Sequence, residues 1–388
     1  MTRSTVVFTD ETQSHEAGIS LGNKIMDGLK GRNPHVVILF ASSIHEYELL
    51  LKGLKQSCNP EIVVGCSSAG EFTSSQSGTD SASAVGIYSL DMKFSAGVGK
   101  AISKDRMDVA DNLVSALQGV EDYEYPYHSA LILADALSGH TDELIDILTE
   151  KTFGTYQFFG GGAGDDAKFE KTHVFLDEQV YTDSAIILEI LSNKPVGIGV
   201  RHGWKPVGDK MRVTESIGSK LVSINAMPAV EVFTQYAKNT GQDFDVSKPI
   251  PFFLHNIVGM EMENGYKLRV PLVVESDGSI ICASDIPTGA IISFMGIGED
   301  AASLAAEDAT KAALEQLHLN KPSVALFFDC VATRLRMGKE FNVELEKVKN
   351  SLDPAKYAGC NTNGQIARVE GQFSGFHNCT AVVCIIPE

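Results

Sequence analysis

The 388-residue sequence predicts a mixed α/β (α+β) protein with two related lobes of layered sheet and helix, arising from internal duplication. First, a unit of buried strand, helix, glycine corner and second strand occurs three times. Second, two other segments share an order of strand and helix. Third, hydrophobic residues make up 44% and charged residues 21%, as is typical of a folded protein with a substantial core.

Each repeat unit opens with a continuous apolar run, which predicts a buried strand. These runs are HVVILFASS (35–43), SALILADAL (129–137) and SVALFFDCV (323–331). Helical stretches at 44–57, 142–152 and 342–352 follow, and then the corners GCSSAGEF (65–72), GGGAGDD (160–166) and GCNTNGQI (359–366). The closing strands are predicted at 83–90, 184–191 and 380–387. Counted from Val36, Ala130 and Val324, the corner glycine comes after 29, 30 and 35 residues, and this regularity indicates duplication.

A second correspondence joins segments 94–118 and 294–317. Each predicts a strand that ends in Gly-x-Gly and an amphipathic helix that leads into a repeat unit. We therefore expect an N-terminal strand and helix over residues 1–34, one lobe over 35–205 and a second lobe over 206–388.

The corner glycines are expected to let the chain leave a buried strand through backbone angles closed to other residues. Three such corners would lie near a shared cleft, and loops at strand ends are where α/β proteins place ligand sites. A nucleotide site is not expected, because GGGAGDD lacks the last glycine of the dinucleotide motif and two aspartates follow. Gly161 stands where the other corners have Cys66 and Cys360, which favours packing over catalysis for these thiols.

The bulk properties exclude several classes of protein. A net charge of −18 disfavours nucleic acid and anionic membranes as partners. No apolar run reaches the roughly 18 residues of a membrane span, and the N-terminus does not resemble a secretory signal. Seven dispersed cysteines without a C-x-x-C pair are typical of free thiols in a reducing compartment. We expect a cytoplasmic protein without membrane insertion.

The corners supply the candidate ligand contacts, which are Cys66, Ser67, Glu71, Asp165, Cys360 and Asn361. Corner amides would hold an amino acid or related anion, and Glu71 or Asp165 would meet its ammonium group. Two histidines, His173 and His377, lie in the same loop region. A thiolate enzyme that uses Cys66 or Cys360, and a scaffold for other proteins, are alternatives, but we expect no catalysis.

Nearly the whole chain resembles the FIST family, with FIST N and FIST C domains in tandem. The resemblance is carried by VVGCSSAGEF, FFGGGAGDDAKFEKTHVFLD, GWKPVGDKMRVTESIGSKLVSINAMPAVEVF, YKLRVPLVVESDGSIICASDIPTGAIISFM, LFFDCVATRLRMG and HNCTAVV. The third corner departs from the family pattern, because Gln365 stands where a glutamate is expected.

The resemblance implies an intracellular sensory module that binds a small ligand. Some members are similar to haem proteins that sense nitric oxide and control a kinase, and others bind small molecules such as amino acids. The most concrete expectation is a haem b nitric oxide sensor, with His377 or else His173 as the iron ligand. A haem-free sensor of an amino acid is the alternative. Without a transmitter of its own, the chain would act on a separate histidine kinase, chemoreceptor or cyclic-di-nucleotide enzyme.

Overall fold

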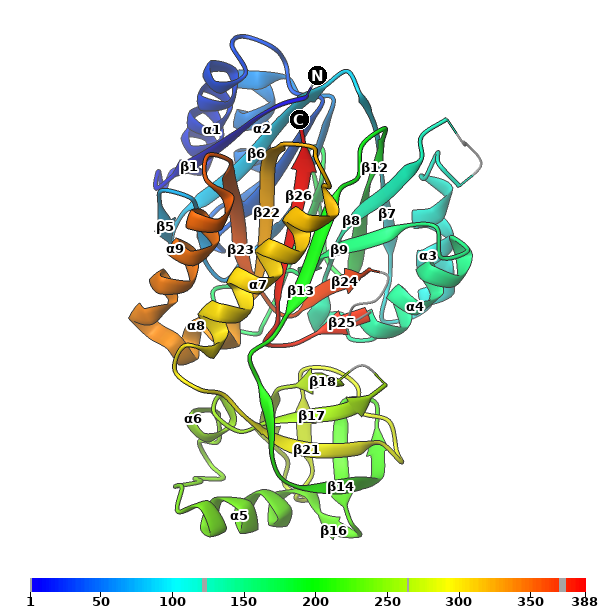
Figure 1. Ribbon diagram of the computed structural model, residues 1–388, viewed down its shortest axis with the longest axis vertical. Coiled ribbons are helices and arrows are strands. Elements are labelled where there is room, and N and C mark those ends of the chain that lie inside the picture. Colours follow the sequence, from blue (N-terminus) through cyan, green and yellow to red (C-terminus); the bar gives the residue numbers. More distant parts are fainter. Residues whose placement is uncertain (1, 121–123, 264, 370–374) are drawn as a thin grey trace.

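Three sheets with helices on their outer sides form the upper part of Figure 1, and a fourth sheet forms a separate lobe below them. The computed structural model describes residues 2–120, 124–263, 265–369 and 375–388. Both ends of the chain lie at the top of this view, far from the lower lobe.

The three predicted repeat units all form. The first comprises β1 (Thr2–Thr9), α1 (Ser14–Gly28), β2 (Val36–Ala41), α2 (Tyr47–Cys58), β3 (Ile62–Ser67) and β6 (Ala82–Ser89). The second comprises β7 (Met92–Lys100), α3 (Arg106–Ser115), β8 (Tyr127–Ala134), α4 (Thr141–Lys151), β9 (Gln157–Gly162) and β12 (Ser184–Ser192). The third comprises β13 (Gly197–Arg201), α7 (Ala301–Gln316), β22 (Pro322–Cys330), α8 (Val331–Met337), α9 (Phe341–Leu352), β23 (Lys356–Thr362) and β26 (Ala381–Pro387).

The units share one topology. Their strand orders are β1-β6-β2-β3, β7-β12-β8-β9 and β13-β26-β22-β23. In each unit the central strand pairs in parallel with the strand that carries the corner glycine and antiparallel with the closing strand. The predicted mixed α+β class is confirmed, and so is the repeated order of strand, helix, corner and strand.

Each unit completes its sheet with a hairpin from another unit. These hairpins are β4 (Glu71–Thr73) with β5 (Ser77–Gly78), β10 (Val174–Leu176) with β11 (Gln179–Tyr181), and β24 (Gln365–Arg368) with β25 (Gly375–His377). The first unit gives β4 to β23 of the third, the second gives β10 to β3 of the first, and the third gives β24 to β9 of the second. The exchange is cyclic, so the turns after the three corners all lie between units.

The expected role of the corner glycines was wrong for two of them. Gly65, Gly160 and Gly359 lie inside their strands, and of these three only Gly160 has a positive φ, at +139°. A Cβ on them would lie 2.2, 2.0 and 1.9 Å from the carbonyl oxygen of the paired residue on the central strand. Close approach of two backbones therefore explains the repeated glycine. The left-handed turns come later, at Gly70 (φ +132°) and Gly364 (φ +122°).

The lower lobe is an insertion between β13 and α7. Its elements are β14 (Lys205–Ile217), β15 (Lys220–Ile224), β16 (Met227–Pro228), α5 (Ala229–Thr240), α6 (Ile250–Phe253), β17 (Ile257–Met262), β18 (Gly265–Arg269), β19 (Pro271–Val274), β20 (Ile280–Cys282) and β21 (Ile291–Gly296). The expected correspondence between segments 94–118 and 294–317 was therefore right for their helices and wrong for their strands. Helices α3 and α7 are equivalent, but the counterpart of β7 in sheet order is β13, whereas segment 294–317 begins in β21.

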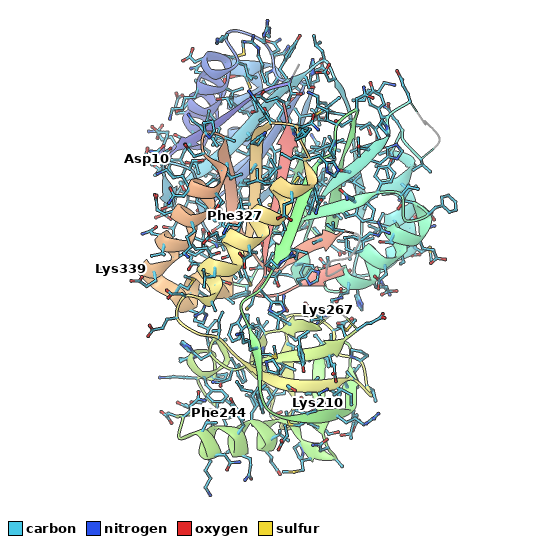
Figure 2. The ribbon with its side chains drawn as sticks, viewed as in Figure 1. Asp10, Lys210, Phe244, Lys267, Phe327 and Lys339 are labelled. Carbon is cyan, nitrogen blue, oxygen red and sulfur yellow. The ribbon has the colours of Figure 1, made fainter. Side chains whose placement is uncertain are left out.

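A buried ion network holds the inserted lobe against the second unit. The Asp142 carboxylate on α4 accepts hydrogen bonds from Lys267 Nζ (2.6 Å), from the Arg269 guanidinium and from the backbone N–H of Phe376 (2.8 Å). Arg269 is 1% exposed. Lys267 marks this junction in Figure 2. These bonds compensate the cost of burying the charges, which is large for an unpaired ion.

The main core lies where the inner faces of the three sheets meet. It contains residues of all three units, among them the rings of Phe40 and Phe328, which contact edge to face at 5.6 Å. Cys66 and Cys360 lie in the same cluster. Across the described residues, no helix is long and apolar enough to cross a membrane.

Candidate functional site

Three cavities occupy related places between the units. In each, the chain between a central strand and the following helix faces the segment after the corner of a neighbouring unit. The Glu71 cavity, of about 280 Å³, is lined by Glu71, Phe72, Ser77, Gly78, Thr79, Arg334, Gly338, Phe341, Asn342 and Asn361. The His173 cavity, of about 390 Å³, is lined by Ser43, His45, Glu46, Tyr47, Glu48, Asp165, Lys168, Glu170, Lys171 and His173.

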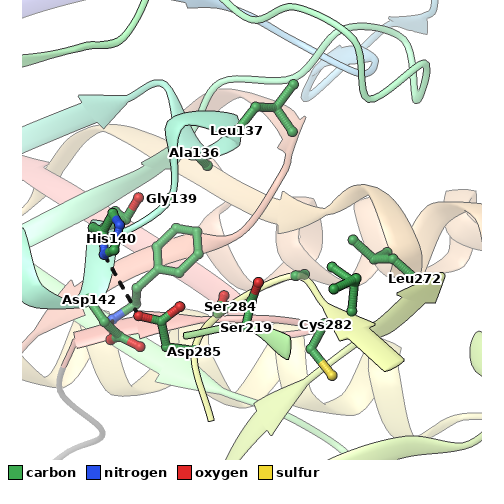
Figure 3. A pocket seen from close by; sticks show the side chains of 14 residues that line it. Ala136, Leu137, Gly139, His140, Asp142, Ser219, Leu272, Cys282, Ser284 and Asp285 are labelled. Carbon is green, nitrogen blue, oxygen red and sulfur yellow. Dashed lines mark hydrogen bonds and ion pairs between the residues drawn. The ribbon is translucent and has the colours of Figure 1, made fainter. Parts of the chain in front are cut away.

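The third of these cavities, in the second unit, is covered by the inserted lobe. This capped cavity, of about 200 Å³, is lined by residues 136–142 without Ser138, by Phe376 and by Ser219, Leu272 and residues 281–285 of the insertion. Figure 3 shows His140 and Asp285 facing each other across it, with 4.0 Å between Nδ1 and the carboxylate. Asp142 is paired with Lys267 and Arg269, and His140 lies beside Asp285, so this cavity serves first as the joint between lobe and body.

The structure brings some predicted ligand residues together and separates others. Glu71 and Asn361 line the Glu71 cavity, whereas Asp165 and His173 line the His173 cavity. Cys66, Ser67 and Cys360 are fully buried. His377 ends β25 beside the Asp142 network. The predicted shared cleft is therefore a set of separate cavities around one core.

Glu71 is a fully buried carboxyl group on the short strand β4. Its two oxygens accept hydrogen bonds from the Ser68 hydroxyl and from the Ser81 hydroxyl, the latter at 2.5 Å. Burial raises the pKa of Glu71 to about 8, against the lowering effect of the two hydroxyls and of the Arg334 guanidinium. At neutral pH the group is mostly protonated, so it can donate a hydrogen bond.

Arg334 approaches the cavity from α8 of the third unit. Within the described residues, the one hydrogen bond of its guanidinium runs from Nη1 to the carbonyl oxygen of Ala69, at 2.5 Å. A Cβ on Gly70 would lie 1.6 Å from that nitrogen, so only glycine fits there. The guanidinium is thus held in place while most of its donors remain available to a ligand.

Asn361 is the most informative residue of the cavity. It is fully buried on β23, and within the described residues neither its Oδ1 nor its Nδ2 has a hydrogen-bond partner. Its backbone is paired with that of Ala69 and Gly70, so the residue cannot turn away. Burying an unpaired amide costs about 1–3 kcal/mol, and nearly all buried polar side chains have partners. A bound molecule that pairs with both atoms would remove this cost.

The other predicted contacts have structural surroundings. The Asp165 carboxylate accepts the backbone N–H groups of Phe169, Glu170 and Lys171 at 2.9, 2.6 and 3.0 Å, which is a turn-capping arrangement. Burial raises the pKa of the Cys360 thiol well above its usual range, as expected for an inert core cysteine.

Neither predicted iron ligand has surroundings that fit haem. His377 is 3% exposed, and burial followed by the nearby Lys267 lowers its pKa to about 3. Its neighbours include the charged side chains of Asp142 and Arg269, where a haem would need apolar contacts. His173 has an unpaired Nδ1 among the described atoms, but the cavity beside it carries four carboxylates and two lysines.

Two residues were not expected from the sequence: Arg334, which lines the Glu71 cavity, and Asn363, which lies outside it and lines a smaller cavity beside Cys330. Arg334 lies in the segment LFFDCVATRLRMG, which contributed to the family resemblance but did not suggest a ligand contact. Arg334 reaches the first corner only because the first unit adds its hairpin to the sheet of the third unit. Asn363, two residues after Asn361 along the extended chain, is a second buried amide with neither atom paired within the described part. The Asn-Thr-Asn motif at 361–363 is the sequence feature that could have drawn attention to both buried amides.

Two family models match most of the chain. The FIST N domain matches residues 35–227, and the FIST C domain matches residues 229–368, in agreement with two predicted lobes. An uncharacterized protein of Methanocaldococcus jannaschii is 23% identical over 308 residues, which cover 72% of this chain and 57% of that protein. The chain thus spans little more than half of that relative.

Similarity to solved structures is weak. T. maritima PurL complexed with AMPPCP is 13% identical, and the alignment covers 99% of this chain and 72% of that chain with a TM-score of 0.22. The same protein complexed with ATP is 12% identical, with coverages of 100% and 71% and a TM-score of 0.23. TM-scores this low do not establish a common fold.

Proposed function

The chain belongs to the FIST family, whose domains are small-ligand sensory modules in signalling, and we propose that this member senses a small carboxylate, such as an amino acid, in the Glu71 cavity. The observation that carries the proposal is the buried Asn361 amide, neither atom of which has a hydrogen-bond partner among the described residues. A polar group in that state is explained most simply by a ligand that pairs with it.

The charges of the cavity favour an anion. Arg334 brings a positive charge, and in the described part of the chain only one of its donors has a partner; Glu71 is mostly neutral because its pKa is about 8. A ligand carboxylate would pair with the guanidinium in the strong charge-assisted geometry and accept a bond from protonated Glu71. The predicted pairing of Glu71 with an ammonium would instead require the buried carboxyl to ionise. In an amino acid, the ammonium falls to Asn361 Oδ1.

The cavity also has a position suited to signalling. Glu71 lies on a strand of the first unit that pairs with the third, and Arg334 and Asn361 belong to the third unit. A ligand held by all three would favour one relative position of the units, and its differential affinity sets the size of the shift. We propose that a separate histidine kinase, chemoreceptor or cyclic-di-nucleotide enzyme in the cytoplasm reads this shift.

The test is calorimetric titration of the protein with individual amino acids and small mono- and dicarboxylates. One ligand per chain is expected, and at 100 times Kd it should stabilise the fold by about 2.7 kcal/mol. Arg334→Met should weaken binding by about 30-fold or more, because truncating one partner of a buried charge pair costs about 2–5 kcal/mol.

Matched controls separate the cavity from general effects. Arg212→Met, at an exposed arginine of the insertion, should leave affinity unchanged. Asn361→Leu should abolish binding and yet stabilise the ligand-free protein, because it removes an unpaired amide. Asn363→Leu changes the related amide outside this cavity and should keep binding. Affinity that survives both Arg334→Met and Asn361→Leu would place the ligand elsewhere and overturn the proposal.

Haem with nitric oxide is the second candidate; it rests on the family resemblance alone, against the charged surroundings of His377 and His173. Its test is the absorption spectrum of the protein purified with added haem, before and after reduction and exposure to nitric oxide. A Soret band that shifts with nitric oxide, at one haem per chain, would support it, and His377→Ala and His173→Ala would then identify the ligand. A featureless spectrum would exclude it.

A further inference from the structure

Two cysteines outside the Glu71 cavity lie together where the inserted lobe meets the body. Cys330 is the last residue of β22, directly before α8, and Cys379 lies in the turn between β25 and β26. They are 3% and 6% exposed. Both pack in a cluster with Trp204, Ile257 and Met295, which joins the lobe to the body.

The sulfur of Cys330 is surrounded by hydrogen-bond donors. The groups near it that favour its ionised form are the Cys379 thiol, the backbone N–H groups of Cys379 and Ala332, and the side-chain amide of Gln365. The bond with the Cys379 thiol is the largest cause that lowers the pKa of Cys330 to about 7, and burial opposes it. About half of this thiol is therefore ionised at pH 7, and the thiolate is the reactive form.

Cys330 is also reachable from a small cavity. The space measures about 50 Å³ and is lined by Cys330, Val331, Ala332, Leu137 and the unpaired amide of Asn363, among others. A void that holds one water needs about 10–15 Å³, so this cavity admits molecules a little larger than water and excludes bulky reagents. Hydrogen peroxide has that size and is polar enough to pair with the Asn363 amide.

We propose that Cys330 and Cys379 form a peroxide-reactive thiol pair, in which Cys330 attacks the oxidant and Cys379 resolves the product. The Cys330 thiolate attacks one peroxide oxygen, the O–O bond breaks, and the leaving hydroxide takes a proton to become water. The Cys379 sulfur then attacks the Cys330 sulfenic acid, the S–O bond breaks, and the Cys379 proton leaves with the hydroxyl as a second water. Two thiols are oxidised to a disulfide, and one hydroperoxide is reduced to water.

The bond would fix the end of β22 to the turn before β26, at the joint between the inserted lobe and the body. Because α8 starts at the next residue, oxidation would also hold the first turn of the helix that carries Arg334. Reaction of the thiols does not depend on what the Glu71 cavity binds, so its test is independent of the sensing proposal.

The chain supplies a matched control pair. Cys66 and Cys360 also have their thiols in contact, but they are fully buried and the pKa of Cys360 is raised. At pH 7 a thiol with the ordinary pKa of 9 is about 1% ionised, so Cys330 has about 50 times more thiolate than such a thiol, and the raised pKa of Cys360 widens the difference. Lower intrinsic nucleophilicity reduces this advantage to about sixfold.

The experiment treats the full chain with hydrogen peroxide at pH 7, quenches with acid, and maps reduced and oxidised cysteines by mass spectrometry. We expect a Cys330–Cys379 disulfide that forms at least about fivefold faster than any other cysteine is lost. Cys379→Ser should accumulate a sulfenic acid on Cys330 that dimedone traps, and Cys330→Ser should leave Cys379 reduced. In the native protein, a bulky maleimide should not react with Cys330.

Two results would overturn the proposal. One is that Cys330 stays reduced for as long as Cys66 and Cys360 do. The other is that Cys330 is oxidised in the unsubstituted protein without forming a bond to Cys379. If a serine variant fails to fold, as judged by its circular dichroism spectrum, the disulfide map of the unsubstituted protein decides alone.

Discussion

Replacing Glu71 by glutamine should make the protein more stable at neutral and alkaline pH. The buried carboxyl has a pKa of about 8 in the folded state, against an ordinary value of 4.5. Between these values the folded protein holds a proton that the unfolded chain has lost. The free energy of unfolding therefore falls as pH rises, by about 1.36 kcal/mol per pH unit from this group.

The loss from Glu71 amounts to about 3 kcal/mol between pH 4.5 and pH 7, and to about 4 kcal/mol by pH 8, where the group is half ionised in the folded protein. Glutamine has nearly the same shape and stays neutral, so it escapes this loss. The chain already carries glutamine at the related position of the third corner, where Gln365 is fully buried and bonds Thr362 Oγ1 at 2.9 Å. Glu71→Gln should match the unsubstituted protein near pH 4.5 and exceed it by about 3 kcal/mol at pH 7.

The assay is equilibrium urea unfolding of both proteins at intervals from pH 4.5 to pH 9. Burial also raises the pKa of Glu344 to about 8 and that of Asp329 above its usual range, so both proteins should lose stability with rising pH. The difference between the two curves isolates Glu71. Parallel curves across this range would refute the assignment of a protonated buried carboxyl at position 71.

Three further outcomes are expected. Gly70→Ala should abolish ligand binding, because the added Cβ would displace Arg334, and calorimetry that shows unchanged affinity would contradict this. It should also lower the free energy of unfolding, measured in urea, by about 1–3 kcal/mol, because the φ of Gly70 is unfavourable for alanine. Asp142→Asn should destabilise the protein by about 3–5 kcal/mol, because it leaves the buried Arg269 without its counter-ion. Proteolysis should then cut faster inside residues 205–296 than in the body, and equal cleavage rates would contradict this. Gly359→Ala should cost more than about 3 kcal/mol, since its Cβ would lie 1.9 Å from a backbone oxygen, and a loss below 1 kcal/mol would refute the close-approach explanation.

The sequence predicted the parts of the fold that depend on local pattern. Continuous apolar runs located the central and closing strands, and the helices α2, α4 and α9 begin within about three residues of the expected positions. The exchange of hairpins could not be predicted, because the partner of a three-residue strand such as β4 is decided by registers hundreds of residues away. The insertion was not predicted either, because the sequence pattern of its strands resembles that of a repeat unit.

The candidate site was predicted in half. Glu71 and Asn361 lie in corner motifs that the repeat made visible, and both line one cavity. Arg334 was missed because an arginine in a short helix has no distinctive pattern, and only the tertiary fold brings α8 to the first corner. Asp165 occupies a corner as well, but three backbone N–H groups engage it, and sequence does not reveal where backbone donors point.

The cyclic exchange of hairpins has a consequence for how the protein can be divided. A fragment that ends at residue 227, where the first matched domain ends, would keep β9 and β13 but lose β24 and β26, which pair with them. The remaining fragment would lose β4 from β23. Each half would expose unpaired strand edges, which recruit other chains. The two matched domains are therefore not independent folding units, and each needs strands of the other to complete its sheets.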